Sequence, residues 1–221
     1  MQLDLRITLL SASSFARGDG LPGQVDNEVA HDPRTGLPFI HGRSVKGLLG
    51  EECANILCSM EMAAGAPVAE YVDAGVRLFG APGATSADEG TLSVSHALLP
   101  RSLRAAVSRL LTRNTDVKPR EILESLTDVR RQTAASVYGV PVDHTLRSAR
   151  VVSPGLTFIS KLMAPDDTTE AAKGLLAACA SAMRRGGASR NRGRGRLVAA
   201  LDRQDEFLQG FAENVGSVGE R

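Results

Sequence analysis

Arginine and glycine are concentrated between residues 184 and 196, a stretch that holds six arginines and no acidic residue. Glycine lets a backbone approach a phosphate chain closely because it has no Cβ, and guanidinium groups donate paired hydrogen bonds to phosphate oxygens. This composition predicts a polyanion-binding loop, although a solvated, flexible turn explains the segment equally well on its own. The candidate contacts are Gly187, Arg190, Arg192, Arg194 and Arg196.

A second candidate phosphate site lies at the expected start of a helix. Apolar residues recur at helical spacing and predict a helix over residues 44–60 with Ser44 as its N-cap. The free N–H groups and the dipole at such a start favour an anion, so Ser44 and Lys46 are candidate phosphate contacts. The alternative is an ordinary N-cap followed by an exposed lysine. Gly47 costs a helix about 1 kcal/mol relative to Ala, which indicates that backbone or a ligand comes close to this face.

The other chemically active residues exclude several kinds of site. The four histidines and three cysteines lack the spacing of zinc ligands, and the histidines lack the close pairing expected of an acid/base nuclease. An odd number of cysteines fits buried free thiols in a reducing cytoplasm. No phosphate-binding nucleotide loop, dinucleotide fingerprint or nucleophile elbow is present, which excludes nucleotide hydrolysis and dinucleotide redox chemistry.

The composition is that of a globular domain with a mostly aliphatic core. The chain has 221 residues, of which 43% are hydrophobic, 23% charged and 4% aromatic, and its net charge is +1. This length fits one domain with sizeable insertions. The N-terminal segment has charged residues within its apolar stretch and no apolar run of membrane-spanning length follows, so we expect a cytoplasmic protein without a membrane partner.

Hydrophobic periodicity predicts the elements that must position these residues. Strict alternation indicates a first strand, a long and flexible connection without periodicity follows, and helices and strands then alternate. The series strand, helix, strand, strand, helix, strand is the ferredoxin-like split βαβ arrangement of the α+β class. The expected elements are strands at 2–10, 91–99, 155–163 and 196–201, helices at 44–60, 102–112 and 168–184, the long connection at 11–43 and a projecting hairpin at 127–152.

Residues 23–57 resemble the signature of RAMP-superfamily backbone subunits of type III CRISPR effector complexes, with the Csm type closest and the Cmr type next. That signature has an Asp-containing loop, an acid-Pro turn, a Pro-aromatic-Ile-x-Gly step and a Ser-x-Lys-Gly helix start. The chain departs from it at His41 and Arg43. Further matching segments are LFG at 78–80, TDVRRQTAAS at 127–136, ARVVSPGLTFISKL at 149–162 and GGASRNRGRGRL at 186–197.

The resemblance implies a fold and a set of partners. It implies a single ferredoxin-like RAMP domain over residues 1–221, with insertions at about 11–43 (a catalytic-type loop), 60–90 and 100–152 (the thumb region). The implied partners are crRNA, target RNA, other copies of the chain in head-to-tail order and other subunits of a type III complex. The implied RNA-binding set combines the candidates above with Arg43.

The resemblance also implies an activity. Csm-type subunits carry the aspartate needed for target-RNA cleavage at the position of Asp26, so the chain is expected to be a metal-dependent endoribonuclease that uses Mg²⁺. Asp32 could assist. From the residues alone a loop aspartate is more often a turn former, which leaves a non-catalytic guide-binding subunit as the alternative. A RAMP protein that processes precursor guide RNA would need a catalytic histidine, for which His41 is the candidate.

Overall fold

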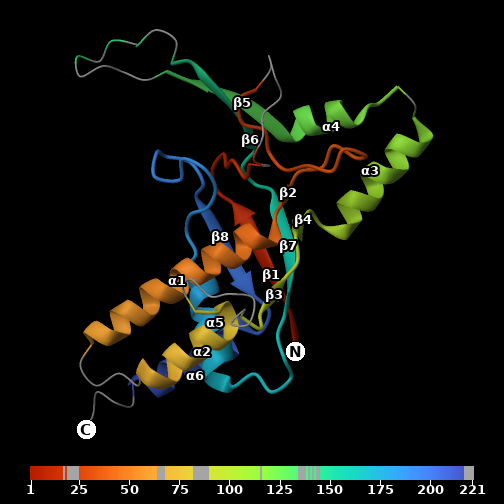
Figure 1. The fold of residues 1–221 in the computed structure, drawn as a ribbon. Coiled ribbons are helices and arrows are strands. Elements are labelled where there is room, and N and C mark those ends of the chain that lie inside the picture. Colours follow the sequence, from red (N-terminus) through yellow and green to blue (C-terminus); the bar gives the residue numbers. More distant parts are fainter. Residues whose placement is uncertain are drawn as a thin grey trace.

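The computed structural model describes most of the chain and contains one main sheet, a set of helices packed against it and a projecting arm (Figure 1). The sheet and four helices form the body of the molecule. The arm holds two helices and a long hairpin. The described residues are 1–16, 18, 25–63, 68–81, 90–114, 116–133, 138, 140, 142 and 145–216.

The main sheet is antiparallel and has β1 next to its centre. Strand β1 (Gln2–Leu9) pairs with β7 (Thr157–Met163) on one side and with β8 (Leu197–Leu201) on the other. The order is β2-β4-β7-β1-β8, and β3 also pairs with β7. The remaining three strands of the sheet are β2 (Phe39–Ile40), β3 (Ser93–Val94) and β4 (Ala97–Leu98). This is the ferredoxin-like order, so the expected fold class is confirmed.

One face of this sheet carries the core. Along β1 the inward side chains of Leu3, Leu5, Ile7 and Leu9 are all buried, as the alternating pattern predicts. They belong to the same apolar cluster as residues of the packed helices. Those helices are α1 (Gly42–Met62), α2 (Val68–Phe79), α5 (Glu170–Ala182) and α6 (Gln204–Gly216). Helix α5 packs on α1, α2 and α6 and is almost entirely buried.

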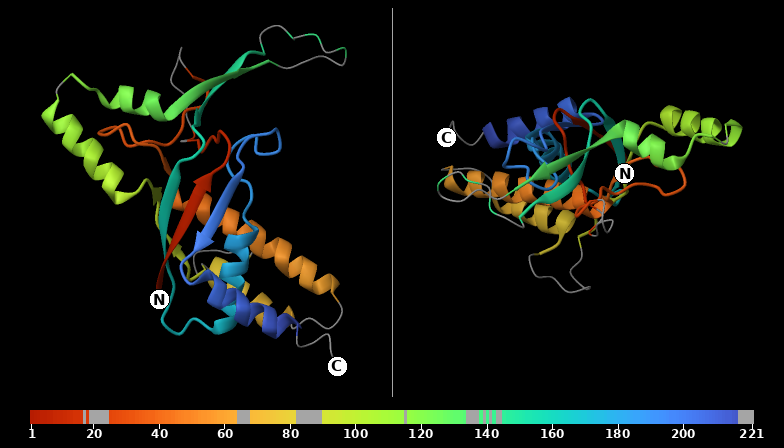
Figure 2. Two further views of the ribbon diagram at one scale, coloured as in Figure 1. Left: turned by 180° about the vertical axis from the view of Figure 1, so that it is seen from behind. Right: turned by 90° about the horizontal axis from the view of Figure 1, so that it is seen from above.

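The arm lies between β4 and β7 in the chain. Helices α3 (Arg101–Arg113) and α4 (Pro119–Leu126) lead into strands β5 (Thr127–Gln132) and β6 (Arg147–Val152). The two strands pair antiparallel in a separate sheet and project away from the body (Figure 2). The predicted projecting hairpin is therefore confirmed, and parts of its far end lie outside the described residues. The helix expected near residues 102–112 is α3.

The start of α1 differs from the sequence prediction. The helix begins at Gly42 with His41 at the N-cap position, so the prediction of Ser44 as the N-cap is wrong. The reason is a partner distant in sequence: the Gly42 amide donates to Nδ1 of His96 at 3.0 Å. The expected strand at 91–99 is correspondingly divided into β3 and β4, since His96 lies between them and turns toward the helix.

The long connection after β1 is irregular but fastened along its described length. Isolated bridges join Ser13 to Val152, Ser14 to Ala188 and Asn27 to Ala149. Buried apolar residues such as Val25 and Val29 anchor it to the interior. Within the described residues, no helix has the length and apolar character needed to cross a membrane.

Candidate nucleic-acid interface

A cavity of about 670 Å³ lies where the connection after β1, the hairpin and the glycine-rich loop (residues 186–196) meet. We call it the Asp26 cleft. It brings the predicted catalytic residue together with two predicted RNA-binding arginines that lie far away in sequence. Its lining residues are Ser14, Asp26, Asn27, Gln132, Thr133, Thr145, Arg147, Ser148, Ala149, Ala188, Ser189, Arg192 and Arg194.

Asp26 is held in this cleft by strand β6. The Ser148 amide donates to Oδ2 of Asp26 at 2.6 Å and the Ser148 hydroxyl donates to the same oxygen at 2.9 Å. The Asp26 amide in turn donates to the Ser148 hydroxyl at 3.1 Å. The backbone hydrogen bond from Ser148, followed by that of its hydroxyl, lowers the pKa of Asp26 below its usual value, and Arg147 adds a smaller effect. Asp26 is therefore ionised and fastened at neutral pH.

The backbone on either side continues this attachment. The Asn27 amide donates to the Ser148 carbonyl at 3.2 Å, and the Arg150 amide donates to the Asn27 carbonyl at 3.0 Å. Asn27 and Ala149 form a parallel bridge. The segment around Asp26 therefore lies parallel to β6 and pairs with it through one bridge. The expectation of a flexible connection is wrong here, because the contacts come from a hairpin more than a hundred residues later in the chain.

The charge of the Asp26 cleft is mainly positive. Arg147, Arg192 and Arg194 line it together with a single carboxylate, that of Asp26. None of these three arginines has an ion pair among the described residues. Guanidinium groups with unused donors in a solvent-filled cleft suit phosphate oxygens. Arg147 and Ser148 were not among the predicted site residues, although the basic RSAR start of β6 was a visible signal.

A second cavity of about 330 Å³ adjoins the first, and we call it the α1 groove. Four predicted contacts line it, from the first two turns of α1 and from the glycine-rich loop. The groove shares Ser14 and Ala188 with the Asp26 cleft. Its lining residues are Ser14, Phe15, Ala16, Ser44, Gly47, Leu48, Gly187, Ala188 and Arg190. The two cavities therefore form adjoining parts of one surface.

Gly47 and Gly187 have different reasons to be glycine. A Cβ at Gly47 would meet nothing within 4 Å, so no part of the described chain requires glycine there. Gly187 has a φ of +86°, and a Cβ there would lie 2.6 Å from the Ser14 carbonyl oxygen. The fold itself therefore requires Gly187. The described chain therefore does not provide the close backbone that was one of the two explanations predicted for Gly47.

Arg190 lies in the α1 groove but is already paired. Its two terminal nitrogens donate to the carboxylate of Glu51 at 2.8 and 2.6 Å. The hydrogen bond from Arg190 lowers the pKa of Glu51, and the same contact raises the pKa of Arg190. This bidentate pair fastens the glycine-rich loop to α1. Arg190 therefore enters the groove as half of a neutral pair.

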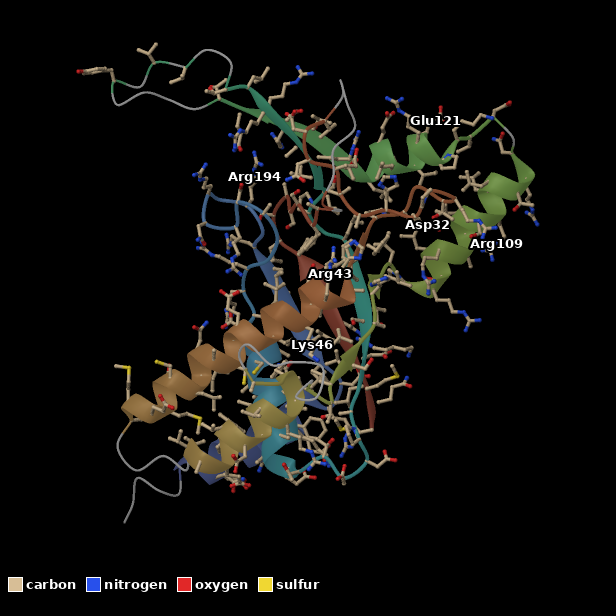
Figure 3. The ribbon with its side chains drawn as sticks, in the orientation of Figure 1. Asp32, Arg43, Lys46, Arg109, Glu121 and Arg194 are labelled. Carbon is tan, nitrogen blue, oxygen red and sulfur yellow. The ribbon has the colours of Figure 1, made fainter. Side chains whose placement is uncertain are left out.

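Three other predicted contacts line neither cavity. Lys46 follows Ser44 by two positions, which places it about 200° around the helix, and its Nζ donates to the Gly90 carbonyl at 3.4 Å. Arg43 and Arg196 are exposed outside both cavities. Figure 3 shows Lys46 well apart from Arg194 at the glycine-rich loop. Ser44 and Lys46, both predicted as phosphate contacts at the start of the helix, therefore lie on different sides of α1.

Asp32 and His41 are both in structural settings. Asp32 accepts from the Arg34 amide and from the Thr35 hydroxyl, each at 2.9 Å, as a turn-forming aspartate does. It does not line the Asp26 cleft. The His41 ring packs against Phe39 and His96 with centroids 5.0 and 5.2 Å away. Burial, with smaller effects of His96 and Arg43, lowers the pKa of His41.

Comparison with known proteins gives a family and a set of similar folds. The model of the RAMP superfamily matches residues 10–198. A chain of the type III-B Cmr-beta complex bound to cognate target RNA has a TM-score of 0.64 at 11% identity, with 94% of this chain and 98% of that chain covered. A chain of a type IV-B CRISPR complex has a TM-score of 0.55 at 18% identity, with 91% and 90% covered. No curated protein sequence matches.

Proposed function

The chain belongs to the RAMP superfamily, and from this premise we propose that it is a crRNA-binding backbone subunit of a type III CRISPR effector complex that cleaves complementary target RNA at Asp26. Its partners would be the guide, the target, further copies of itself and other subunits of the complex. The similarity in fold to chains of CRISPR complexes supports this proposal. So does the composition of the two adjoining cavities.

One observation carries the cleavage proposal: among the described residues, the carboxylate of Asp26 stands in the cleft with three arginines that form no ion pair with any described residue. The arginines would hold the phosphates of a strand in the cleft and so place a phosphodiester beside Asp26. The adjoining α1 groove would hold the guide backbone, because the Ser44 side chain and the open backbone at Gly47 line it together with the glycine-rich loop. Both contacts are to the backbone, so binding would be independent of sequence.

The hydrogen bonds of Asp26 favour one of two possible roles for its carboxylate. A general base works best with a pKa near the working pH. The Ser148 hydrogen bonds move the pKa of Asp26 downward, away from neutrality. Asp26 is therefore a poor proton acceptor and a good fixed negative charge. We assign it the placement of a divalent cation rather than the abstraction of a proton.

The residues of the cleft fit Mg²⁺ only with help from the substrate. Among the described residues there is no group of three or more His, Cys, Asp or Glu that could hold a metal ion. Mg²⁺ is, however, commonly held by one or two carboxylates together with phosphate oxygens and water. Both Ser148 hydrogen bonds end on Oδ2 of Asp26, which leaves Oδ1 for such a ligand. A bound Mg²⁺ would supply charge stabilisation at the phosphate.

The proposed reaction is transfer of the phosphate within the RNA. The 2′-oxygen attacks the adjacent phosphorus, the bond from phosphorus to the 5′-oxygen breaks, and the leaving oxygen gains a proton while the 2′-hydroxyl loses one to solvent. Arg147, Arg192 and Arg194 would neutralise charge on the non-bridging phosphate oxygens. Asp26 would stay ionised throughout.

The Asp26–Ser148 contact also favours the second candidate function, a non-catalytic guide-binding subunit. Three hydrogen bonds join these two residues, which is a sufficient structural reason for an aspartate at this position. In that case Asp26 would only fasten the segment to β6.

Asp26→Asn separates the two functions. Asparagine retains a side-chain oxygen that can accept from Ser148 but lacks the charge. Loss of one electrostatic contribution to a transition state costs about 3 kcal/mol, or roughly a hundredfold in rate. We expect the purified complex with Asp26→Asn to bind target RNA normally and to lose Mg²⁺-dependent cleavage. Asp32→Asn, in the same connection, is the matched control and should cut at the wild-type rate. Equal cutting by wild type and Asp26→Asn would establish the non-catalytic function.

A further inference from the structure

Two residues after Asp26 lies the carboxylate of a buried ion pair. Nε of Arg150 donates to Oε2 of Glu28 at 3.2 Å and lies 2.9 Å from Oε1 in an ion pair. The two side chains are only 8% and 1% exposed. The Val29 amide also donates to Oε1 of Glu28, at 3.0 Å. Hydrogen bonds therefore hold both charged groups of the pair in a defined geometry.

The pair continues into the base of the arm. Another nitrogen of Arg150 donates to the Thr127 hydroxyl at 3.2 Å, and that hydroxyl donates to the Leu123 carbonyl at 2.6 Å. Glu28 belongs to the connection after β1, Arg150 to β6, Thr127 to β5 and Leu123 to α4. One polar chain thus joins the Asp26 segment to the hairpin and to the helix that precedes it.

The Glu28–Arg150 ion pair and the Asp26–Ser148 contact share one register between the segment and β6. Asp26 contacts Ser148, Asn27 bridges Ala149, and Glu28 contacts Arg150, so each residue of the segment faces the corresponding residue of β6. A displacement by one residue would remove both side-chain contacts at once and move Asp26 away from Ser148. The buried Val25 and Val29 already restrain this segment, and the two side-chain contacts add a restraint on which of its residues faces which residue of β6.

Stability is a weak explanation for such a pair. Burial of two charges costs desolvation that their attraction barely repays, and apolar residues of similar volume are often as stable. A buried pair with directional hydrogen bonds does, however, specify a single register. The exposed pair of Asp128 and Arg130 on the adjacent strand, 57% and 55% exposed, lacks this property.

We propose that Glu28 and Arg150 are positioning residues that set the register of the Asp26 segment on β6 and thereby hold Asp26 at the reacting phosphate. This inference rests on the proposed cleavage function. In addition, strand β6 of the hairpin holds the Asp26 carboxylate in position, and this position depends on the Glu28–Arg150 ion pair, which lies outside the Asp26 cleft.

The test uses the purified complex with its guide and target RNA. Glu28→Gln is expected to slow single-turnover cleavage by roughly tenfold or more, because small misplacements of a reacting group are costly. Target affinity should remain within about twofold of wild type, since the arginines of the cleft are unchanged. Asp128→Asn, which breaks the exposed pair of the same hairpin, is the matched control and should cleave normally.

A double variant separates positioning from stability. Glu28→Gln/Arg150→Met leaves no buried unpaired charge and should recover thermal stability without recovering cleavage. It also carries the test if Glu28→Gln does not fold. Hydrogen exchange gives a readout independent of activity: the amides of Asn27 and Ser148 should lose protection in both variants, while the amides that pair β5 with β6 keep theirs.

The outcomes are distinct. If Asp26→Asn abolishes cleavage but Glu28→Gln and the double variant cut at the wild-type rate, the positioning role is wrong and the proposed function stands. If the wild-type complex does not cut, the cleavage proposal fails, and the exchange measurement alone decides whether the pair sets the register. Unchanged protection of Asn27 and Ser148 would then overturn the inference as well.

Discussion

Arg190 and Glu51 form a bidentate ion pair between the glycine-rich loop and α1, with both nitrogen–oxygen distances below 2.9 Å. The carboxylate of Glu51 occupies the donors that a phosphate would use. An RNA backbone in the α1 groove therefore meets a neutral pair rather than a free guanidinium. This arrangement turns a residue predicted as a phosphate contact into one that orders the loop.

Substitutions of the two members of this pair should have opposite effects on the affinity for RNA. Glu51→Gln removes the competing charge and frees Arg190, so affinity for single-stranded RNA should rise and its dependence on salt should steepen slightly. Arg190→Ala leaves the Glu51 carboxylate facing the groove and should lower affinity. Titration of both variants at several salt concentrations tests this. Weaker binding by Glu51→Gln would show that loop order, rather than charge, dominates.

Arg192 and Arg194 should contribute more to RNA binding than Lys46. Both arginines line the Asp26 cleft, whereas Lys46 donates to the Gly90 carbonyl. The double variant Arg192→Ala/Arg194→Ala should lower affinity with little sequence preference and reduce the salt slope by about 0.7 per lost contact to a single strand. Lys46→Ala should alter both quantities less. An equal or larger effect of Lys46→Ala would place the RNA path along the other side of α1.

His41 should make the protein less stable as the pH falls. Burial, with His96 and Arg43, lowers the pKa of His41 in the folded protein. The unfolded chain then binds a proton at His41 more readily than the folded protein does. The stability that depends on neutral His41 is therefore complete above the ordinary pKa of the unfolded chain, and it is lost as the pH falls through the lowered pKa of the folded protein. His41→Gln should therefore lose less free energy of unfolding than wild type between about pH 7 and about pH 5. Denaturant unfolding at both pH values measures the difference, and equal losses would contradict it.

Local patterns predicted several of the elements but not the contacts between them. The alternation in β1 and the helical spacing in α1 predicted both elements within a few residues. The start of α1 was missed because His96, far along the chain, accepts from the Gly42 amide. Helices α2, α4 and α6 were not predicted, although Tyr71, Ala74 and Leu78 of α2 recur at helical spacing and are buried.

In the candidate site, too, single residues could be predicted from the sequence but their arrangement could not. Asp26, Arg192 and Arg194 could each be selected from the sequence, on resemblance or on composition. Their common cleft could not, because it depends on the hairpin that holds Asp26 through Ser148. The buried Glu28–Arg150 pair joins two residues from separate matching segments, and no sequence pattern indicated that they pair.

Gly47 and Gly50 provide the sharpest test of where the RNA backbone lies. Both are within α1, and neither needs to be glycine for the fold: a Cβ at Gly47 meets nothing within 4 Å, and one at Gly50 makes an ordinary contact of 3.6 Å with the Phe79 ring. Alanine at either position should therefore stabilise the protein by about 0.5–1 kcal/mol through helix propensity.

The two variants should differ in RNA binding, because only Gly47 lines the α1 groove. A methyl group at residue 47 would keep a phosphate backbone from closing on the helix, so Gly47→Ala should bind guide RNA several-fold more weakly while unfolding at a higher denaturant concentration. Gly50→Ala should gain the same stability and bind RNA as wild type does. Measurement of unfolding and RNA affinity on the same preparations decides the matter: a Gly47→Ala protein that is stabilised and still binds fully would show that the guide does not pass through the α1 groove.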